Sequence, residues 1–215
     1  MDGTLVDSIP YHTKSLAVFC ERHGIDVDIG NLMRRVNGLN GAESMRELFQ
    51  RPLDEAEAWA LIHEKEIIYR ELFDPVFREV PGVRDFAKRA ASLRLKYGVG
   101  TAGDKQNIAF VFSHLTLTPA PLAIVGGDEG LPGKPAPAIF LEVAKRMDVV
   151  AAGCIVFEDA PFGIEAARRA GMRAVAICTS HSAAELSGPH VLAHVRDYNE
   201  LLNSNFLEKL HVAIE

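Results

Sequence analysis

The first third of the chain has the hydrophobic period of α-helices. Leu16, Phe19 and Cys20 fall on one helical face. Asp54, followed three residues later by Glu57, forms a capping-box pattern that predicts the start of another helix. The apolar stripe of that helix consists of Trp59, Ile62, Tyr69 and Phe73. We therefore predict that residues 9–73 are helical.

After Pro81 and Gly82 the pattern changes to short apolar runs that alternate with helical stripes, as a parallel α/β sheet requires. The predicted strands are residues 95–101, 122–125, 154–157, 173–177 and 191–195. We expect a doubly wound, Rossmann-like parallel sheet. Residues 1–8 and 81–215 would form this α/β core, and residues 9–80 would form an inserted helical cap.

Composition and charge narrow the class of protein. The chain has 215 residues, 48% of them hydrophobic, which suffices for one core and a small accessory domain. Its net charge of −6 offers no basic surface for nucleic acid or anionic lipid. No apolar run approaches the roughly 20 residues of a membrane helix. We expect a cytoplasmic monomer with neither nucleic acid nor membrane as a partner.

The residues directly after the predicted strands carry the candidate chemistry, because reactive groups of such sheets lie beyond the carboxyl ends of the strands. Thr101 is the last residue of the first strand, Lys134 lies in the loop after the second, and Glu158 and Asp159 follow the third. The chain itself begins with an acidic residue, Asp2. Paired carboxylates suit Mg²⁺, while a lysine and a hydroxyl can bind phosphate oxygens. Phosphoryl transfer is the chemistry that this set predicts.

Each of these residues also has a purely structural interpretation. Lys134 fits a solvated loop, the usual place of a lysine. Glu158 and Asp159 fit the start of a helix, which Pro161 in the first turn supports. Thr101 needs no function to explain it, since β-branched residues are common in strands.

Four segments taken together favour the catalytic interpretation. They are Met1-Asp2-Gly3-Thr4-Leu5-Val6-Asp7-Ser8, Thr101-Ala102-Gly103-Asp104, Gly133-Lys134-Pro135-Ala136-Pro137 and Phe157-Glu158-Asp159-Ala160-Pro161-Phe162-Gly163-Ile164. In this order they resemble the motifs of the haloacid dehalogenase superfamily, particularly its β-phosphoglucomutase-like and phosphoglycolate-phosphatase-like members with a helical cap. The resemblance covers nearly the whole chain.

The resemblance implies a role for each matching residue. Asp2 would be the general acid and base, and Lys134 would neutralise charge and orient the nucleophile. Thr101, Lys134 and the amides of Ala102 and Gly103 would bind the transferring phosphoryl group. The implied Mg²⁺ ligands are the backbone carbonyl of Asp2 and the side chains of Glu158 and Asp159.

The resemblance also assigns substrate contacts to the cap. His12 lies near the expected hinge and would take part in cap closure. Arg34, Arg35 and the loop 37–40 are similar to the cap loop that meets substrate in the mutase-like members. Arginine suits a second phosphate or a carboxylate.

In the family the nucleophile is the aspartate two positions before the acid/base aspartate. That position lies one residue ahead of Met1, and the first core strand would precede it. We expect a longer form of the protein that carries both. A protein that has lost catalysis is the alternative, and the apolar run at residues 210–214 is a candidate substitute for the strand.

The leading functional hypothesis is a Mg²⁺-dependent phosphatase of a small phosphorylated metabolite, such as a sugar phosphate or phosphoglycolate, acting through an aspartyl-phosphate. A sugar-phosphate mutase would use the same intermediate. A non-catalytic protein that binds phosphate or metal is the alternative from another class. A dehalogenase is disfavoured, because that reaction makes little use of Asp2, Glu158 or Asp159.

Overall fold

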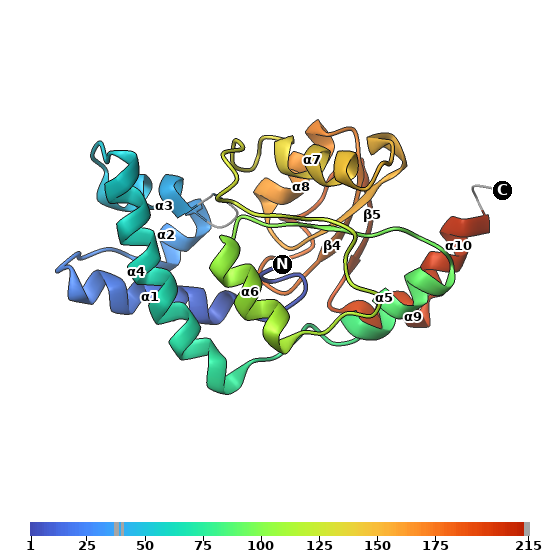
Figure 1. Cartoon of the computed structure of the whole chain (residues 1–215), viewed down its shortest axis with the longest axis horizontal. Helices are drawn as coiled ribbons and strands as arrows, with labels where there is room; N and C mark the ends of the chain where they lie inside the picture. Colours follow the sequence, from blue (N-terminus) through green and yellow to red (C-terminus); the bar gives the residue numbers. More distant parts are fainter. Residues whose placement is uncertain (37–38, 40, 213–215) are drawn as a thin grey trace.

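The computed structural model describes residues 1–36, 39 and 41–212, in which a helical lobe lies beside a parallel α/β core (Figure 1). The lobe has an apolar core of its own, which includes Phe19, Leu32 and Met45. Asp54 caps its last helix as predicted, accepting a 2.8 Å hydrogen bond from the backbone N of Glu57. The helices of the lobe are α1 (Ile9–Arg22), α2 (Ile29–Val36), α3 (Gly41–Phe49) and α4 (Glu55–Phe73). The division into domains at residues 8 and 80 stays a prediction.

The core contains two parallel sheets, which confirms the predicted fold class. One pairs β1 (Val99–Gly100) with β2 (Ile124–Val125). The other has the order β3 (Ile155–Glu158), β4 (Arg173–Ile177) and β5 (Val191–Val195). The first two strands are shorter than the predicted runs, because β1 and β2 are hydrogen-bonded only to each other within the described residues.

Helices cover both faces of these strands (Figure 1). The residues of β4 show the effect, since Val175 and Ile177 join the apolar cluster on one face while Ala174 and Ala176 join the cluster on the other. A strand buried on both faces reads as a continuous apolar run. The remaining helical elements are α5 (Val83–Ser92), α9 (Tyr198–Asn203) and α10 (Phe206–Val212) on one face, α7 (Ala138–Arg146) and α8 (Pro161–Arg169) on the other, α6 (Lys105–His114) towards the lobe, and the short turns η1 (Asp74–Val76) and η2 (Ala151–Gly153).

The suggestion that residues 210–214 form a strand is wrong for the part that the structure describes. Leu210 lies within α10, which continues to Val212. Residues 213 and 214 lie outside the described range. The period of the run fits the buried face of a helix as well as a strand, because short apolar runs do not separate the two.

Two adjacent segments connect the lobe to the core. The outgoing segment forms an antiparallel bridge at Val6 with Glu79 of the returning segment. Flanking hydrogen bonds run from Val80 N to Leu5 O at 2.9 Å and from Asp7 N to Arg78 O at 3.1 Å. The chain therefore leaves and re-enters the core at one place.

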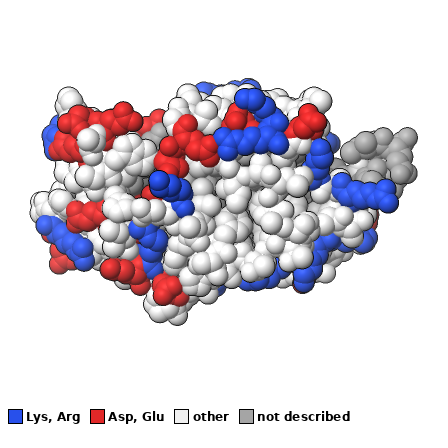
Figure 2. Space-filling model, in the orientation of Figure 1, with Lys and Arg blue, Asp and Glu red and all other residues white. Residues whose placement is uncertain are grey.

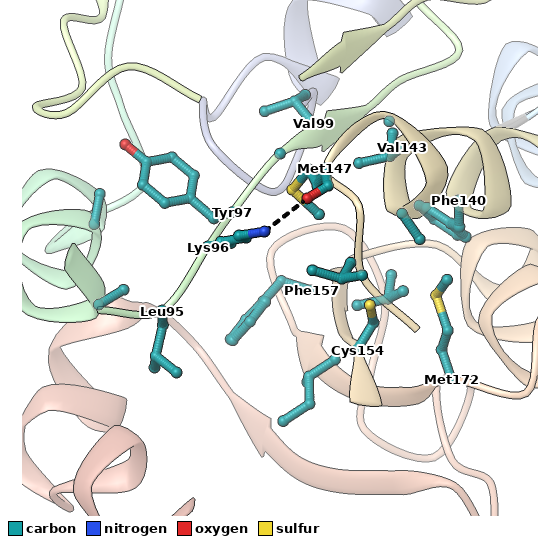
Figure 3. A pocket seen from close by; sticks show the side chains of 18 of the residues that line it. Leu95, Lys96, Tyr97, Val99, Phe140, Val143, Met147, Cys154, Phe157 and Met172 are labelled. Carbon is teal, nitrogen blue, oxygen red and sulfur yellow. Dashed lines mark hydrogen bonds between the residues drawn. The ribbon is translucent and has the colours of Figure 1, made fainter. Parts of the chain in front are cut away.

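A cavity of about 600 Å³ separates β1 from β3 (Figure 3). Val99 lines it from the β1 side and Phe157 from the β3 side. Phe86 of α5 and Val143 of α7 close its two faces. We call this space the interstrand slot: it is bounded by two strands that run in the same direction and by two apolar helix faces.

The surface carries mixed charge. Figure 2 shows Lys and Arg interspersed with Asp and Glu over the helical lobe and an uncharged area at the centre of the same face. None of the helices in the described part of the chain combines the length and apolar character needed to span a bilayer.

Replacing Phe73 by Ala should destabilise the protein strongly. Phe73 is fully buried at the end of α4, with the rings of Tyr11 and Phe77 about 5 Å away (5.0 and 5.1 Å). Deleting a buried phenylalanine side chain costs about 3–5 kcal/mol. Urea denaturation should show this loss, while Val150→Ala, at a position 78% exposed, should change stability little. A loss below about 1 kcal/mol for F73A would contradict the assigned packing.

Candidate active site

The N-terminal loop, residues 1–8, is anchored at the centre of the molecule (Figure 1). Gly3 adopts φ 66°, and a Cβ at this position would lie 2.0 Å from Asp159 Oδ2. Only glycine avoids both the strained backbone and this overlap. Thr4 Oγ1 donates a 3.0 Å hydrogen bond to Asp159 Oδ1. The start of the chain is thereby held against a residue that follows β3.

Asp2 is surrounded by hydrogen-bond donors. Its Oδ1 accepts from Ser8 Oγ at 2.7 Å and Tyr69 Oη at 3.2 Å, and it lies 3.1 Å from His12 Nε2. Burial by itself raises the pKa of Asp2, but the contact with His12, the nearby amine of Met1 and the hydrogen bond from Ser8 together outweigh burial, so this pKa lies below its ordinary value. Asp2 is therefore an ionised carboxylate in this arrangement.

Lys134 and Glu158 form a buried ion pair. Their side chains are only 6% and 7% exposed, and Lys134 Nζ contacts Glu158 Oε1 directly. Glu158 Oε2 accepts from the backbone N of Asp159 at 2.8 Å and of Ala160 at 3.0 Å, just before α8. Burial raises the pKa of Glu158, but the charge of Lys134 outweighs it and the pKa falls below its ordinary value. Lys134 is thus a buried cation rather than a solvated loop residue.

Among the residues that the structure describes, no cationic side chain is hydrogen-bonded to the Asp159 carboxylate. Its Oδ2 accepts from Ser180 Oγ at 2.6 Å, and its Oδ1 accepts from Thr4. Burial, and then the charge of Glu158, raise the pKa of Asp159 to about 7. The negative charge of Asp159 is therefore poorly compensated by the residues around it.

The segments converge on Met1. Its amine is buried, which lowers the pKa of that amine, and its charge interacts with Asp2, Lys134, Glu158 and Asp159. Sequence reasoning placed these four side chains in one site, and the structure brings them together from segments far apart in the chain. Their individual roles stay predictions.

The loop after β1 lies over the same region. Thr101 is buried, and its Oγ1 accepts a 3.1 Å hydrogen bond from the backbone N of Gly103. A Cβ on Gly103 would lie 3.1 Å from Met1 Cε, so the two loops are in contact. Gly103 O accepts from Gly127 N at 2.9 Å, which fixes the loop from its other side.

A cavity of about 130 Å³ lies between this loop and the helical lobe. Asp2, Ala102 and Gly103 line it from the core, and His12 and Lys65 line it from the lobe. Ligand pockets usually enclose about 300–1,000 Å³. The lobe is therefore closed too tightly here to admit a sugar phosphate without moving.

The predicted arginines of the lobe do not line this cavity. Arg34 and Arg35 are both exposed on α2, and Arg35 pairs with Glu47 at 2.7 Å. Of the predicted loop 37–40, residues 37, 38 and 40 lie outside the described range. Binding of substrate by these arginines stays a prediction that this closed arrangement does not support.

The side chains of Asp159 and Glu158 stay the predicted Mg²⁺ ligands, and both lie at the end of β3. Within the described residues, no three His, Cys, Asp or Glu side chains are grouped as metal ligands. Oδ1 of the Asp2 carboxylate faces His12 and Ser8, whereas the predicted metal contact is the backbone carbonyl of Asp2. Mg²⁺ usually takes one or two protein carboxylates and keeps several waters. The excess buried negative charge at Asp159 fits such a cation.

Sequence reasoning missed several residues of the site. Ser180 lies in the loop after β4, three residues beyond Ile177, so the rule that directs attention to the loops beyond strand ends could have found it. Tyr69 was assigned to the apolar core of its helix, and its hydroxyl contact with Asp2 carries no sequence signal. Lys65 had no signal either, because lysines in amphipathic helices are normally exposed.

Polar groups that gather beyond the carboxyl ends of parallel strands are typical of doubly wound α/β proteins. Within that class, residues 1–177 match the model of the haloacid dehalogenase-like hydrolase family, and the chain belongs to this family.

Relatives within the family include fructose-1-phosphate phosphatase of Escherichia coli, 36% identical over 81% of this chain and 92% of the relative. A phosphorylated carbohydrates phosphatase of Thermotoga maritima is 30% identical over 81% of each. The solved β-phosphoglucomutase of Clostridium difficile matches with a TM-score of 0.84 and 26% identity, over 99% of this chain and 95% of that one. The family and its phosphatases support a phosphohydrolase enzyme.

Asp159→Asn should flatten the pH dependence of stability in EDTA. The pKa of about 7 in the folded protein exceeds the ordinary aspartate value of about 4. The folded state therefore binds more protons than the unfolded state, and wild-type stability falls as pH rises from about 4 to about 7. Asparagine does not ionise, so this component of the pH dependence disappears.

Urea denaturation at pH 5 and pH 8 measures the difference. Asp85→Asn, at a side chain 72% exposed, is the matched control and should keep the wild-type dependence. Mg²⁺ should stabilise the wild type at pH 8 and D159N much less. Parallel pH profiles for wild type and D159N would refute the assignment of Asp159.

Proposed function

We propose that this protein is a Mg²⁺-dependent phosphatase of a small phosphorylated sugar or a similar metabolite, working through an aspartyl-phosphate. The observation that carries the proposal is the convergence of Asp2, Lys134, Glu158 and Asp159 around Met1. Relatives named as phosphatases of fructose 1-phosphate and of phosphorylated carbohydrates support the substrate class.

Asp2 would transfer the proton. Its Oδ1 is already approached by three donors, from Ser8, His12 and Tyr69, so Oδ2 is the atom assigned to the proton. Ionised Asp2 would act as the base towards water, and protonated Asp2 as the acid towards the leaving oxygen. Tyr69 stays a neutral donor, since burial and then the charge of Asp2 raise its pKa.

The other side chains would bind the phosphoryl group and its charge. The Thr101 hydroxyl and the amide of Ala102 would supply hydrogen-bond donors at the end of β1, and the amide of Gly103 would join them by exchanging its present bond to Thr101 Oγ1 for a phosphate oxygen. Lys134 supplies a buried positive charge, and Asp159 with Glu158 would hold Mg²⁺. The ion would supply further positive charge to the phosphate oxygens. Positioned charge of this kind provides most of the catalysis in phosphoryl transfer.

The proposed nucleophile is an aspartate joined directly to the amino end of Met1. The interstrand slot supports this placement, because it is apolar, lies between parallel strands and has Met1 near their carboxyl ends. A strand running along β1 and β3 would deliver its last residue next to Lys134. Such a strand would also complete the backbone hydrogen bonding along both edges.

A sugar-phosphate mutase is the second candidate. The structural match to a β-phosphoglucomutase extends over 99% of this chain, including the lobe. A mutase would return the phosphoryl group to the sugar, and it would need a sugar bisphosphate for steady turnover. Release of inorganic phosphate without a bisphosphate therefore separates the two functions.

The test compares the chain as it stands with a form extended by an apolar strand that ends in aspartate before Met1. The extended form should hydrolyse p-nitrophenyl phosphate and sugar phosphates in Mg²⁺ and lose activity in EDTA. The unextended chain should be slower by about 10⁶-fold, the loss in kcat when a hydrolase loses its covalent nucleophile.

Asp2→Asn in the extended form should lower kcat by about 10²–10⁴-fold, the usual contribution of a general acid or base. Asp85→Asn on the exposed face of α5 is its matched control. If the extended protein is folded and inert on every phosphate ester, the catalytic proposal fails. Phosphate binding without turnover would then favour the non-catalytic alternative.

A further inference from the structure

Two neighbouring charged residues of α4, Lys65 and Glu66, are buried. Each is only 7% exposed, although α4 is otherwise a helix of the lobe with an ordinary polar face. Buried charges persist only when they are paired and hydrogen-bonded. The partners of this pair are therefore the reason that it is tolerated.

The pair belongs to a continuous line of hydrogen bonds. Lys65 Nζ lies 2.8 Å from His12 Nδ1 and donates to Glu66 Oε1 at 2.8 Å. Glu66 Oε2 accepts from Asn107 Nδ2 at 2.7 Å. At the other end, His12 Nε2 reaches Asp2 Oδ1. The line thus runs from Asn107 through Glu66, Lys65 and His12 to Asp2.

The chemistry of the partners fixes the direction of each bond. The ammonium of Lys65 can only donate, so His12 Nδ1 must accept and Nε2 must carry the hydrogen that faces Asp2. Asn107 is oriented in the same way: its Oδ1 accepts from Arg70 Nη1 at 2.7 Å, and its Nδ2 faces Glu66. Burial raises the pKa of Glu66, but the charge of Lys65 and the hydrogen bonds from Lys65 and Asn107 act against burial. The pKa lies below its ordinary value, so the carboxylate remains an acceptor.

The line crosses twice between the lobe and the core. Asp2 and Asn107 belong to the core, whereas His12, Lys65 and Glu66 belong to the lobe. Asn107 lies in the first turn of α6, where its backbone N donates to Asp104 at the end of the loop 101–104. The line is therefore complete only when the lobe lies against α6.

We propose that Glu66 and Asn107 are positioning residues that latch the closed lobe and, through Lys65, hold His12 in the tautomer that donates to Asp2. Neither residue touches the reacting atoms. The functional part rests on the proposed role of Asp2 as acid and base, whereas the hydrogen-bonded line itself does not.

The first test measures the His12 tautomer by ¹⁵N NMR of the labelled chain as it stands. The wild type should show hydrogen on Nε2 alone. Glu66→Gln places an amide donor against Asn107, and Asn107→Ala removes the partner, so both should give mixed tautomers. Glu64→Gln is the matched control, because Glu64 lies on the same helix and bonds the exposed His23 at 3.0 Å.

The second test is kinetic and uses the extended form. E66Q and N107A should each lower kcat by at least about tenfold. The double variant should lose no more than either single variant, since both break one latch. E64Q should match the wild type. If E66Q fails to fold, N107A still tests the proposal, because it leaves the buried Lys65–Glu66 pair intact.

An unchanged tautomer in N107A, or additive losses of kcat, would overturn the latch. If the tautomer shifts as expected but no form of the protein hydrolyses phosphate esters, the latch stands and the proposed function fails. The two proposals can therefore fail separately.

Discussion

Burial of Lys134, Glu158 and Asp159 at the end of β3 is the constraint on which the rest of the structure depends. Three charges inside a protein must be neutralised and hydrogen-bonded by what surrounds them. Lys134 forms an ion pair with Glu158, while Thr4 and Ser180 donate hydrogen bonds to Asp159. These partners come from three other segments, so the N-terminal loop, the loop after β2 and the loop after β4 are all held at one point. Only Asp159 remains poorly compensated, and a cation would complete the arrangement.

Much of the fold follows from the sequence, because hydrophobic period is a local property. Helical stripes in the lobe and apolar runs in the core predicted the elements, and their order predicted a parallel sheet. The strand ends then located Thr101 and the Glu158–Asp159 pair. Strand length was predicted less well, since β1 is limited by its neighbours in space rather than by its residues.

The residues that the lobe contributes to the site could not be predicted from hydrophobic period or from strand ends. The buried carboxylate of Glu66 is hydrogen-bonded by Asn107, which lies 41 residues further along the chain. The sequence around Glu66 does not distinguish it from an exposed glutamate. Tyr69 was recognised as apolar, but its hydroxyl meets Asp2 only after the lobe folds onto the core. Conversely, the arginines of α2 had a chemical reason to bind phosphate and yet lie on the surface. Contacts between two folded units depend on how the units pack, which residue type and spacing do not specify.

The paired segments that join lobe and core add a mechanical consequence. Val6 and Glu79 lie side by side, and backbone hydrogen bonds join the two segments on both sides of this bridge. The lobe is therefore connected to the core by one paired hinge and not by two independent linkers. Paired backbone connections of this kind resist sliding of the lobe along the core more than they resist rotation. We expect any change in the angle between lobe and core to be centred on residues 5–7 and 78–80.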